Sequence, residues 1–179
     1  MRFLIFCLML SFPVRMEAQS KPWMLTAELD PLPYLTGGYF AALTAGTEQW
    51  RGRVLVADVN MPPMIYPERF GDFHVLSLAA LLDYYPAGRE DGFWYAAGLV
   101  HWDGSIRHED SGQTARWSNW LVNASMGYLW NWNSRLAFSP WAGVSVRVAG
   151  PSAVTVGSTR FRPAALMPEA SLKMIVFLW

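Results

Sequence analysis

The sequence has little charge and no surplus of either sign. Lys and Arg together number 14, Asp and Glu together also number 14, and all four make up only 16% of the chain. A protein that binds nucleic acid through a basic face needs surplus cations to neutralise phosphates, so this class is excluded. Intrinsic disorder is excluded too, because disordered chains are poor in aromatic residues and this chain has ten Trp.

Cysteine is almost absent. The only one, Cys7, lies in an apolar run from Phe3 to Phe12 that follows Arg2 and precedes the small residues Ala18 and Ser20. A positive start, a short apolar core and a small-x-small exit are typical of a secretory signal peptide, and the run is too short for a membrane-spanning helix. The mature chain then has no thiol, which excludes disulfides, Cys-ligated zinc and a Cys nucleophile.

We therefore expect a signal peptide over residues 1–20 and one domain over residues 21–179. Without the two cations and one anion of the leader, 12 cations and 13 anions remain, a net charge of −1. Motifs for bound cofactors are missing as well. The sequence contains no Gly-rich phosphate loop, zinc-finger spacing or dinucleotide fingerprint, so no cofactor is expected.

Long apolar runs are missing after the leader, which makes transmembrane helices unlikely to form. The residues alternate instead with a period of two, which is typical of β-strands. Trp120, Val122 and Met126 share one face of such a segment, while Asn119 and Asn123 share the other. This pattern predicts about eight strands, over residues 23–30, 38–48, 51–60, 73–85, 92–107, 114–131, 135–148 and 170–179.

The distribution of aromatic and charged residues indicates which face of the predicted strands contacts lipid and which points into the interior. The polar faces have few Lys and Glu, the long charged residues of a solvated surface. The apolar faces carry large aromatic residues near the strand ends, where Trp and Tyr concentrate in membrane barrels. We therefore predict polar faces inside and a set of lipid-facing aromatics: Trp23, Trp94, Trp102, Trp120, Tyr128 and Trp130.

The connections alternate strictly in length along the chain. Short turns are predicted at residues 47–50, 86–91 and 132–134, and longer loops at residues 30–36, 61–71, 107–113 and 149–163. Up-and-down outer-membrane barrels have short turns at one end and longer loops at the other. Eight strands also place both chain ends on the side of the short turns.

With these features the sequence resembles the small eight-stranded outer-membrane β-barrels of Gram-negative bacteria (the OmpX/OmpW-like class). The resemblance implies an all-β, antiparallel up-and-down transmembrane barrel in the bacterial outer membrane, with lipid as its surroundings. It also implies that the barrel-assembly machinery reads a C-terminal aromatic signal, which Phe177 and Trp179 match. The alternative facing of this strand stays open, with four residues toward lipid: Leu172, Met174, Val176 and Leu178.

An eight-stranded barrel is just wide enough to be filled by its own side chains. We therefore predict a polar lumen network rather than a pore. Acids and bases nearly balance in it, as a water-poor interior requires, because an unpaired buried charge costs several kcal/mol. The predicted members are Glu28, Asp30, Asp58, Asp83, His101, Asp103, Arg107, Arg135 and Arg147.

The sequence favours a structural or surface-interaction role and leaves two alternatives open. One is a lipid A-modifying enzyme, since some small barrels of this kind carry a Ser–His–acid group on the lipid-facing wall. His101, Asp103 and Ser105 cannot form such a group alone, because same-face residues of one strand lie about 6.6–6.8 Å apart and a nucleophile needs its base within about 3.2 Å. The other is a secreted lipocalin-like carrier with apolar faces inside.

No catalytic or metal-binding residue is therefore predicted. A group of His101, Asp103, His108 and Asp110 has the side chains that suit zinc. A titratable rim, hydrogen-bonded to its neighbours, is the simpler interpretation of these four residues.

Overall fold

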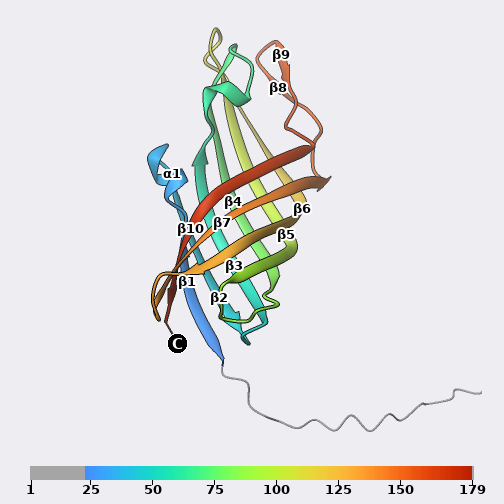
Figure 1. Ribbon diagram of the computed structural model, residues 1–179. Helices are drawn as coiled ribbons and strands as arrows, with labels where there is room; N and C mark the ends of the chain where they lie inside the picture. Colours follow the sequence, from blue (N-terminus) through green and yellow to red (C-terminus); the bar gives the residue numbers. More distant parts are fainter. Residues whose placement is uncertain (1–22, 179) are drawn as a thin grey trace, which may run out of the picture.

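Eight antiparallel strands form a closed barrel in the computed structural model, which describes residues 23–178 (Figure 1). Each strand pairs with the next along the chain, and the last pairs with the first, so the barrel is of the up-and-down type. The predicted fold class is thereby confirmed. The barrel strands are β1 (Met24–Leu29), β2 (Tyr39–Gly46), β3 (Trp50–Asn60), β4 (Phe70–Tyr84), β5 (Gly92–His108), β6 (Thr114–Asn131), β7 (Leu136–Ala149) and β10 (Leu166–Phe177).

The short turns and long loops lie at opposite ends of the barrel, as predicted. The lower end in Figure 1 holds the C-terminus and the start of β1, together with the short turns. The upper end holds the long loops, which contain a helix α1 (Pro31–Leu35), a 3-10 turn η1 (Pro63–Ile65) and a hairpin of β8 (Val154–Val156) and β9 (Thr159–Phe161). No helix within residues 23–178 is long and apolar enough to cross a membrane.

The barrel is largely apolar outside, and its interior combines charged, polar and apolar side chains. On β6, Trp120, Val122 and Met126 are 49%, 43% and 46% exposed, whereas Asn119 and Asn123 are buried in the interior. Strand residues point alternately to the two sides of a sheet, so this one register decides the side of every residue of the strand. The predicted inside-out polarity holds for β1, β4, β6 and β7.

Strand β5 faces the opposite way from the prediction. Trp94 and Trp102 point into the barrel, where they are fully and almost fully buried, and His101 and Asp103 point outward. Glycine makes the room that the first indole needs, because a Cβ at Gly127 would lie 2.6 Å from the Trp94 ring. Large and small residues alternate in this way inside small barrels. The alternation of residues did not predict the facing of β5 because this strand carries apolar residues on both of its faces.

The last strand turns its aromatic residue inward. Ile175 and Phe177 are buried in the lumen, while Leu172 and Leu178 are exposed on the outside. This is the alternative facing that the sequence left open, and it weakens the match of Phe177 to the assembly signal. Trp179 and the predicted signal peptide over residues 1–20 lie outside the described residues.

Candidate functional site

A network of four charged side chains fills the lower lumen. Glu28 of β1 accepts from Lys173 Nζ of β10 at 2.9 Å and from Arg53 Nη1 of β3 at 3.3 Å through the same oxygen, Oε2. Arg53 Nη2 donates to Asp83 Oδ1 of β4 at 3.0 Å. All four are buried, and two acids balance two bases. The network joins four strands across the barrel closure without leaving a net charge inside.

Aromatic and turn groups complete the lower lumen. Lys173 Nζ lies 4.2 Å from the ring centroid of Trp94, and the indole Nε1 of Trp94 donates to Ser139 Oγ at 2.8 Å. Arg51 lies over the ring of Tyr85 at 3.8 Å and donates to the carbonyl oxygens of the two nearest short turns. Cations over aromatic faces and on carbonyls keep partners after they leave water, so this end of the lumen is packed rather than open.

The structure divides the predicted lumen residues into three groups. Inside the barrel lie Glu28, Asp30 and Asp83, and Arg147 lines the upper end, where its Nη1 donates to the carbonyl oxygens of Pro151 and Pro163. The prediction is wrong for Asp58, His101, Asp103 and Arg107, which belong to the outer faces of β3 and β5, and for Arg135, which is exposed in a short turn.

Three further cations lie in the lumen and were not predicted from the sequence: Arg51, Arg53 and Lys173. The sequence pattern did indicate that these cations point inward, because the two neighbours of each one are residues of the apolar outer face. The two arginines share a face with Leu55 and Ala57, which made that face look apolar rather than polar.

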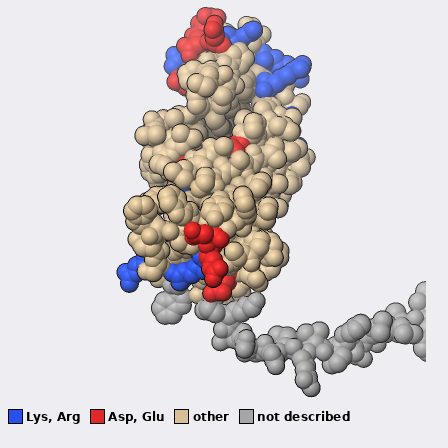
Figure 2. Space-filling view, in the orientation of Figure 1, with Lys and Arg blue, Asp and Glu red and all other residues tan. Residues whose placement is uncertain are grey.

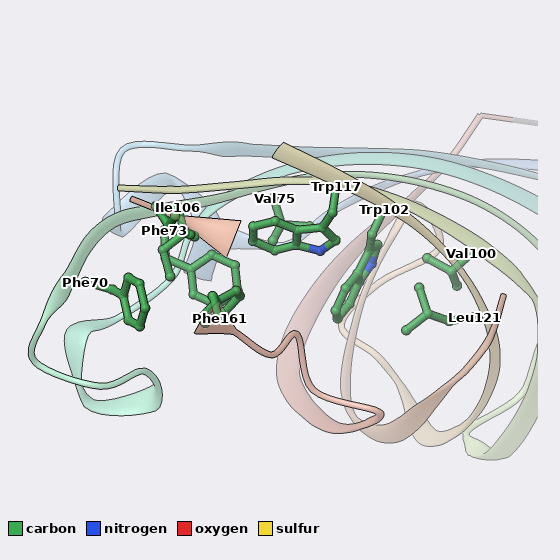
Figure 3. Packing of buried hydrophobic residues seen from close by; sticks show 10 residues of the cluster. Phe70, Phe73, Val75, Val100, Trp102, Ile106, Trp117, Leu121 and Phe161 are labelled. Atoms are coloured by element: carbon green, nitrogen blue, oxygen red, sulfur yellow. The ribbon is translucent and has the colours of Figure 1, made fainter. Parts of the chain in front are cut away.

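A cluster of aromatic residues fills the upper lumen. Phe70 and Phe73 of β4, Trp117 of β6 and Phe161 of β9 are buried together, with ring centroids 5.2–5.6 Å apart in each neighbouring pair. Figure 3 shows the three Phe rings gathered at one end of this cluster, with the Trp rings further along. The hairpin β8–β9 thus closes the upper end of the barrel by inserting Phe161.

A cavity of about 530 Å³ lies between the aromatic cluster and the charged network. Its position is clear along β4, whose inward residues run from Asp83 in the network, through Leu81 and Ala79 on the cavity wall, to Val75 and Phe73 in the cluster. The cavity lies within the range of about 300–1,000 Å³ for small-molecule sites. The prediction of a completely filled lumen is therefore wrong at this level.

The cavity opens toward the side of the barrel where the pairing between β1 and β10 ends. Strand β1 pairs with β10 only from Thr26 to Leu29, opposite 174–177, whereas β10 pairs with β7 from Leu166 to Val176. Helix α1 follows β1, and the Asp30 carboxylate caps it at the Leu32 amide. The upper edge of β10, residues 166–173, therefore has no strand on its β1 side within the described chain, and the cavity reaches outward-facing residues of β10 there.

A second polar site lies on the outer wall. Ser118 of β6 is hydrogen-bonded through Oγ to Nε2 of His101 on β5, at 2.7 Å. The other ring nitrogen of His101, Nδ1, lies 3.8 Å from a carboxylate oxygen of Asp103. The ring of Trp120 lies against the imidazole, with centroids 4.7 Å apart. A hydroxyl, an imidazole and a carboxylate in this order are the parts of an activated serine nucleophile.

The group of His101, Asp103, His108 and Asp110, whose side chains would suit zinc, does not come together in the described structure. His101 lies on the outer face of β5 and His108 on its inner face, where Thr159 Oγ1 is hydrogen-bonded to it. Within residues 23–178 no three His, Cys, Asp or Glu residues come together as metal ligands would. His74 is hydrogen-bonded to Asp58 on the outer wall, two strands from Ser118.

Four of the predicted lipid-facing aromatics are on the outside and two are not. Trp23, Trp120, Tyr128 and Trp130 are exposed, and Trp94 and Trp102 are buried in the lumen. Trp120 and Trp130 are ten residues apart on one strand. With a rise of about 3.3 Å per residue and a tilt of about 40°, they mark a band about 25 Å tall. Figure 2 shows a middle band with almost no charged atoms, between charged patches at both ends.

Comparisons with known proteins support the fold. No protein-family model matches the sequence, and no curated protein matches it significantly. Among solved structures, the crystal structure of Neisserial surface protein A is similar, with a TM-score of 0.50 and 14% identity over 86% of this chain and 96% of that one. At this identity the likeness shows a shared fold, the small β-barrel.

Proposed function

We propose that this chain is an integral outer-membrane β-barrel, with a structural or surface-interaction role at its loop end. The observation that carries the proposal is the apolar belt between Trp120 and Trp130, on a closed barrel whose charged groups lie inside or at the two ends. A closed barrel satisfies its backbone hydrogen bonds between strands, which hydrocarbon surroundings require. A lipocalin-like carrier needs the opposite arrangement, with apolar faces inside.

The location is tested by fractionating cells that express the full chain. We expect the protein in the outer-membrane fraction, with heat-dependent migration on a gel, because a closed barrel stays folded in detergent until it is boiled. The fold shared with Neisserial surface protein A supports the proposed location. Recovery in the soluble periplasmic fraction would overturn the proposal.

If the apolar belt lies in the membrane, the cost of an outward-facing arginine should depend on its depth in the bilayer. Arginine in place of Met126, near the middle of the band, should lower the free energy of unfolding in lipid vesicles by about 2–4 kcal/mol. Arginine in place of Thr114, on the same face of β6 above Trp120, should cost only about 0–1 kcal/mol. Urea titration in vesicles measures both. Equal costs at the two positions would contradict a membrane boundary near Trp120.

A second candidate function is the hydrolysis of ester bonds in outer-leaflet lipids. It is favoured by the contact between Ser118 Oγ and His101 Nε2 at 2.7 Å, on the wall that faces lipid. The site lies at the level of Trp120, where hydrocarbon meets headgroups and where the ester bonds of lipids lie. There His101 would accept the proton of Ser118 as the hydroxyl attacks an ester carbonyl, and would donate it to the leaving alcohol, which leaves the acyl group on Ser118. A water molecule deprotonated by His101 would then attack this acyl-serine, release the fatty acid and restore the serine hydroxyl.

The other residues would act as positioning and stabilising groups. Asp103 lies beside Nδ1 of His101 and would hold the ring so that Nε2 faces the hydroxyl. A side-chain cation would stabilise the oxyanion. Arg116 shares the outer face of β6, two residues before Ser118, and is the cation placed for this task.

A further inference from the structure

The cavity between the charged network and the aromatic cluster is closed at two ends and open at one side. Lys173 and Arg53 line its lower end, and Trp102 and Val100 line its upper end. The exposed residues of its wall come from α1, from the segment around η1 and from the upper edge of β10, so the opening is bordered by these three segments. Because Pro168 and Ala170 point outward from β10, the opening reaches the outer wall of the barrel beside that strand.

The surface around the opening is part of the apolar belt. Leu166, Pro168, Ala170 and Leu172 point outward along the unpaired part of β10, and Leu32 of α1 is exposed beside them. Proline in a strand is confined to edges where its missing N–H does no harm, and Pro168 lies on such an edge. An unpaired strand edge in hydrocarbon is costly unless it lines a cavity or is covered. The opening thus faces lipid tails.

The cavity wall is largely apolar and carries two acids and two cations, of which only the cations are in ion pairs. Asp30 accepts from Ser171 Oγ at 2.6 Å, and Glu169 accepts from Ser145 Oγ at 2.6 Å. Neither carboxylate forms an ion pair within residues 23–178, whereas both cations on the wall are already paired with Glu28. Carboxylates without cations repel an anionic group and favour a donor or a cation.

We propose that the cavity is a lateral binding site for the single hydrocarbon chain of a membrane amphiphile whose polar end is a hydrogen-bond donor or a cation, such as an alcohol or an amine. The chain enters between α1 and β10 and occupies the apolar wall around Leu81 and Val100. Its polar end meets Asp30 and Glu169. The cavity lies inside the barrel, whereas Ser118 lies on the outer wall of β6, two strands from β10, so the site is separate from the candidate hydrolase.

The test uses hexadecylamine, hexadecanol and hexadecanoate, titrated onto the purified full barrel in detergent and followed by native mass spectrometry. We expect one molecule of the amine or the alcohol per barrel, and binding of hexadecanoate weaker by about tenfold or more. Glu169→Gln should reduce the preference for the amine, whereas Glu109→Gln in the exposed loop should not. Equal binding of all three compounds would overturn the polar part of the proposal.

A filled cavity provides the matched control. Ala79 lines the cavity and its neighbour Ala80 points to the outside of the same strand. Ala79→Trp should weaken amine binding by about tenfold or more, because the indole occupies the chain's volume, while Ala80→Trp should leave it unchanged. If Ala79→Trp does not fold, Ala57→Phe replaces it, with Val56→Phe as the outward control. Undiminished binding in a folded cavity-filled variant would overturn the proposal.

This inference rests on the proposed membrane location for the source of the ligand, but its test does not. Binding is measured on the isolated barrel, whereas location is measured by fractionation of cells. A barrel found in the outer membrane that binds none of the three compounds would refute the lateral site alone. A barrel found in the soluble fraction would refute the membrane location, whatever it binds.

Discussion

Replacing Lys173 by Met should lower the free energy of unfolding by about 3–5 kcal/mol, because removal of one partner of a buried ion pair leaves the other charge uncompensated. The partner is Glu28, which is buried and shares its Oε2 between Lys173 and Arg53. After the substitution Arg53 must balance both Glu28 and Asp83, so the remaining network of these three residues carries a net negative charge. Urea titration of the barrel in lipid vesicles, with heat-dependent gel migration as the probe of folding, measures the loss.

The double variant separates charge from packing. Glu28→Gln together with Lys173→Met removes one acid and one base, and Arg53 keeps Asp83 as its partner. Its stability should therefore exceed that of Lys173→Met alone, since no uncompensated charge remains. Arg160→Met, which removes an exposed cation from the hairpin, should change stability by no more than about 0.5 kcal/mol. A double variant as unstable as the sum of the two single variants would show that the pair is not coupled.

The sequence predicted the barrel because its two strongest signals are local. Alternation on β6 places Trp120 and Asn119 on opposite faces without any knowledge of the neighbouring strands, and loop lengths set the up-and-down order. The facing of β5 was not predictable in this way. Phe93 and Tyr95 form an apolar outer face, and Trp94 and Trp102 an apolar inner one. Periodicity alone cannot choose between two apolar faces.

The length of β5 and β6 explains the polar residues on the outside. A membrane-spanning strand needs about 9–11 residues, and these strands have 17 and 18. The surplus extends beyond the band at the loop end, so Asp103 and Arg107 can point outward without entering hydrocarbon. A rule that assigns every charged strand residue to the lumen holds only within the band.

The two candidate sites depend on pairings between strands, which one strand's pattern does not contain. The lateral opening exists because β1 ends at Leu29 while β10 continues upward to Leu166, and only the register between these two strands shows the difference. Ser118 meets His101 because Asp103 pairs with Ser118 and His101 with Trp120 across the β5–β6 hairpin. With this register, the outward facing of His101 is what places its imidazole beside Ser118, so the wrong facing predicted for β5 hid this contact.

Ser118→Ala should abolish the release of fatty acid from ester-linked lipids by the purified barrel, if the outer-wall site is a hydrolase. Loss of a serine nucleophile typically costs at least about 10³-fold in rate, because the imidazole then has no hydroxyl to activate. His101→Ala should cost about as much, since the two act as one unit. The assay follows fatty acid released from phospholipid and from lipopolysaccharide in mixed micelles, with covalent labelling by a fluorophosphonate as a second readout.

Ser105→Ala is the matched control, because Ser105 lies on the same outer wall, opposite Arg116, and is not hydrogen-bonded to His101. It should keep full activity, and the fluorophosphonate should label Ser118 in this variant and in the unmodified barrel. Arg116→Gln should lower the rate without preventing labelling if the guanidinium stabilises the oxyanion rather than the nucleophile. An unmodified barrel that neither releases fatty acid nor takes the label would refute the hydrolase, and would leave Ser118 as a hydrogen-bond partner that holds His101 at the membrane boundary.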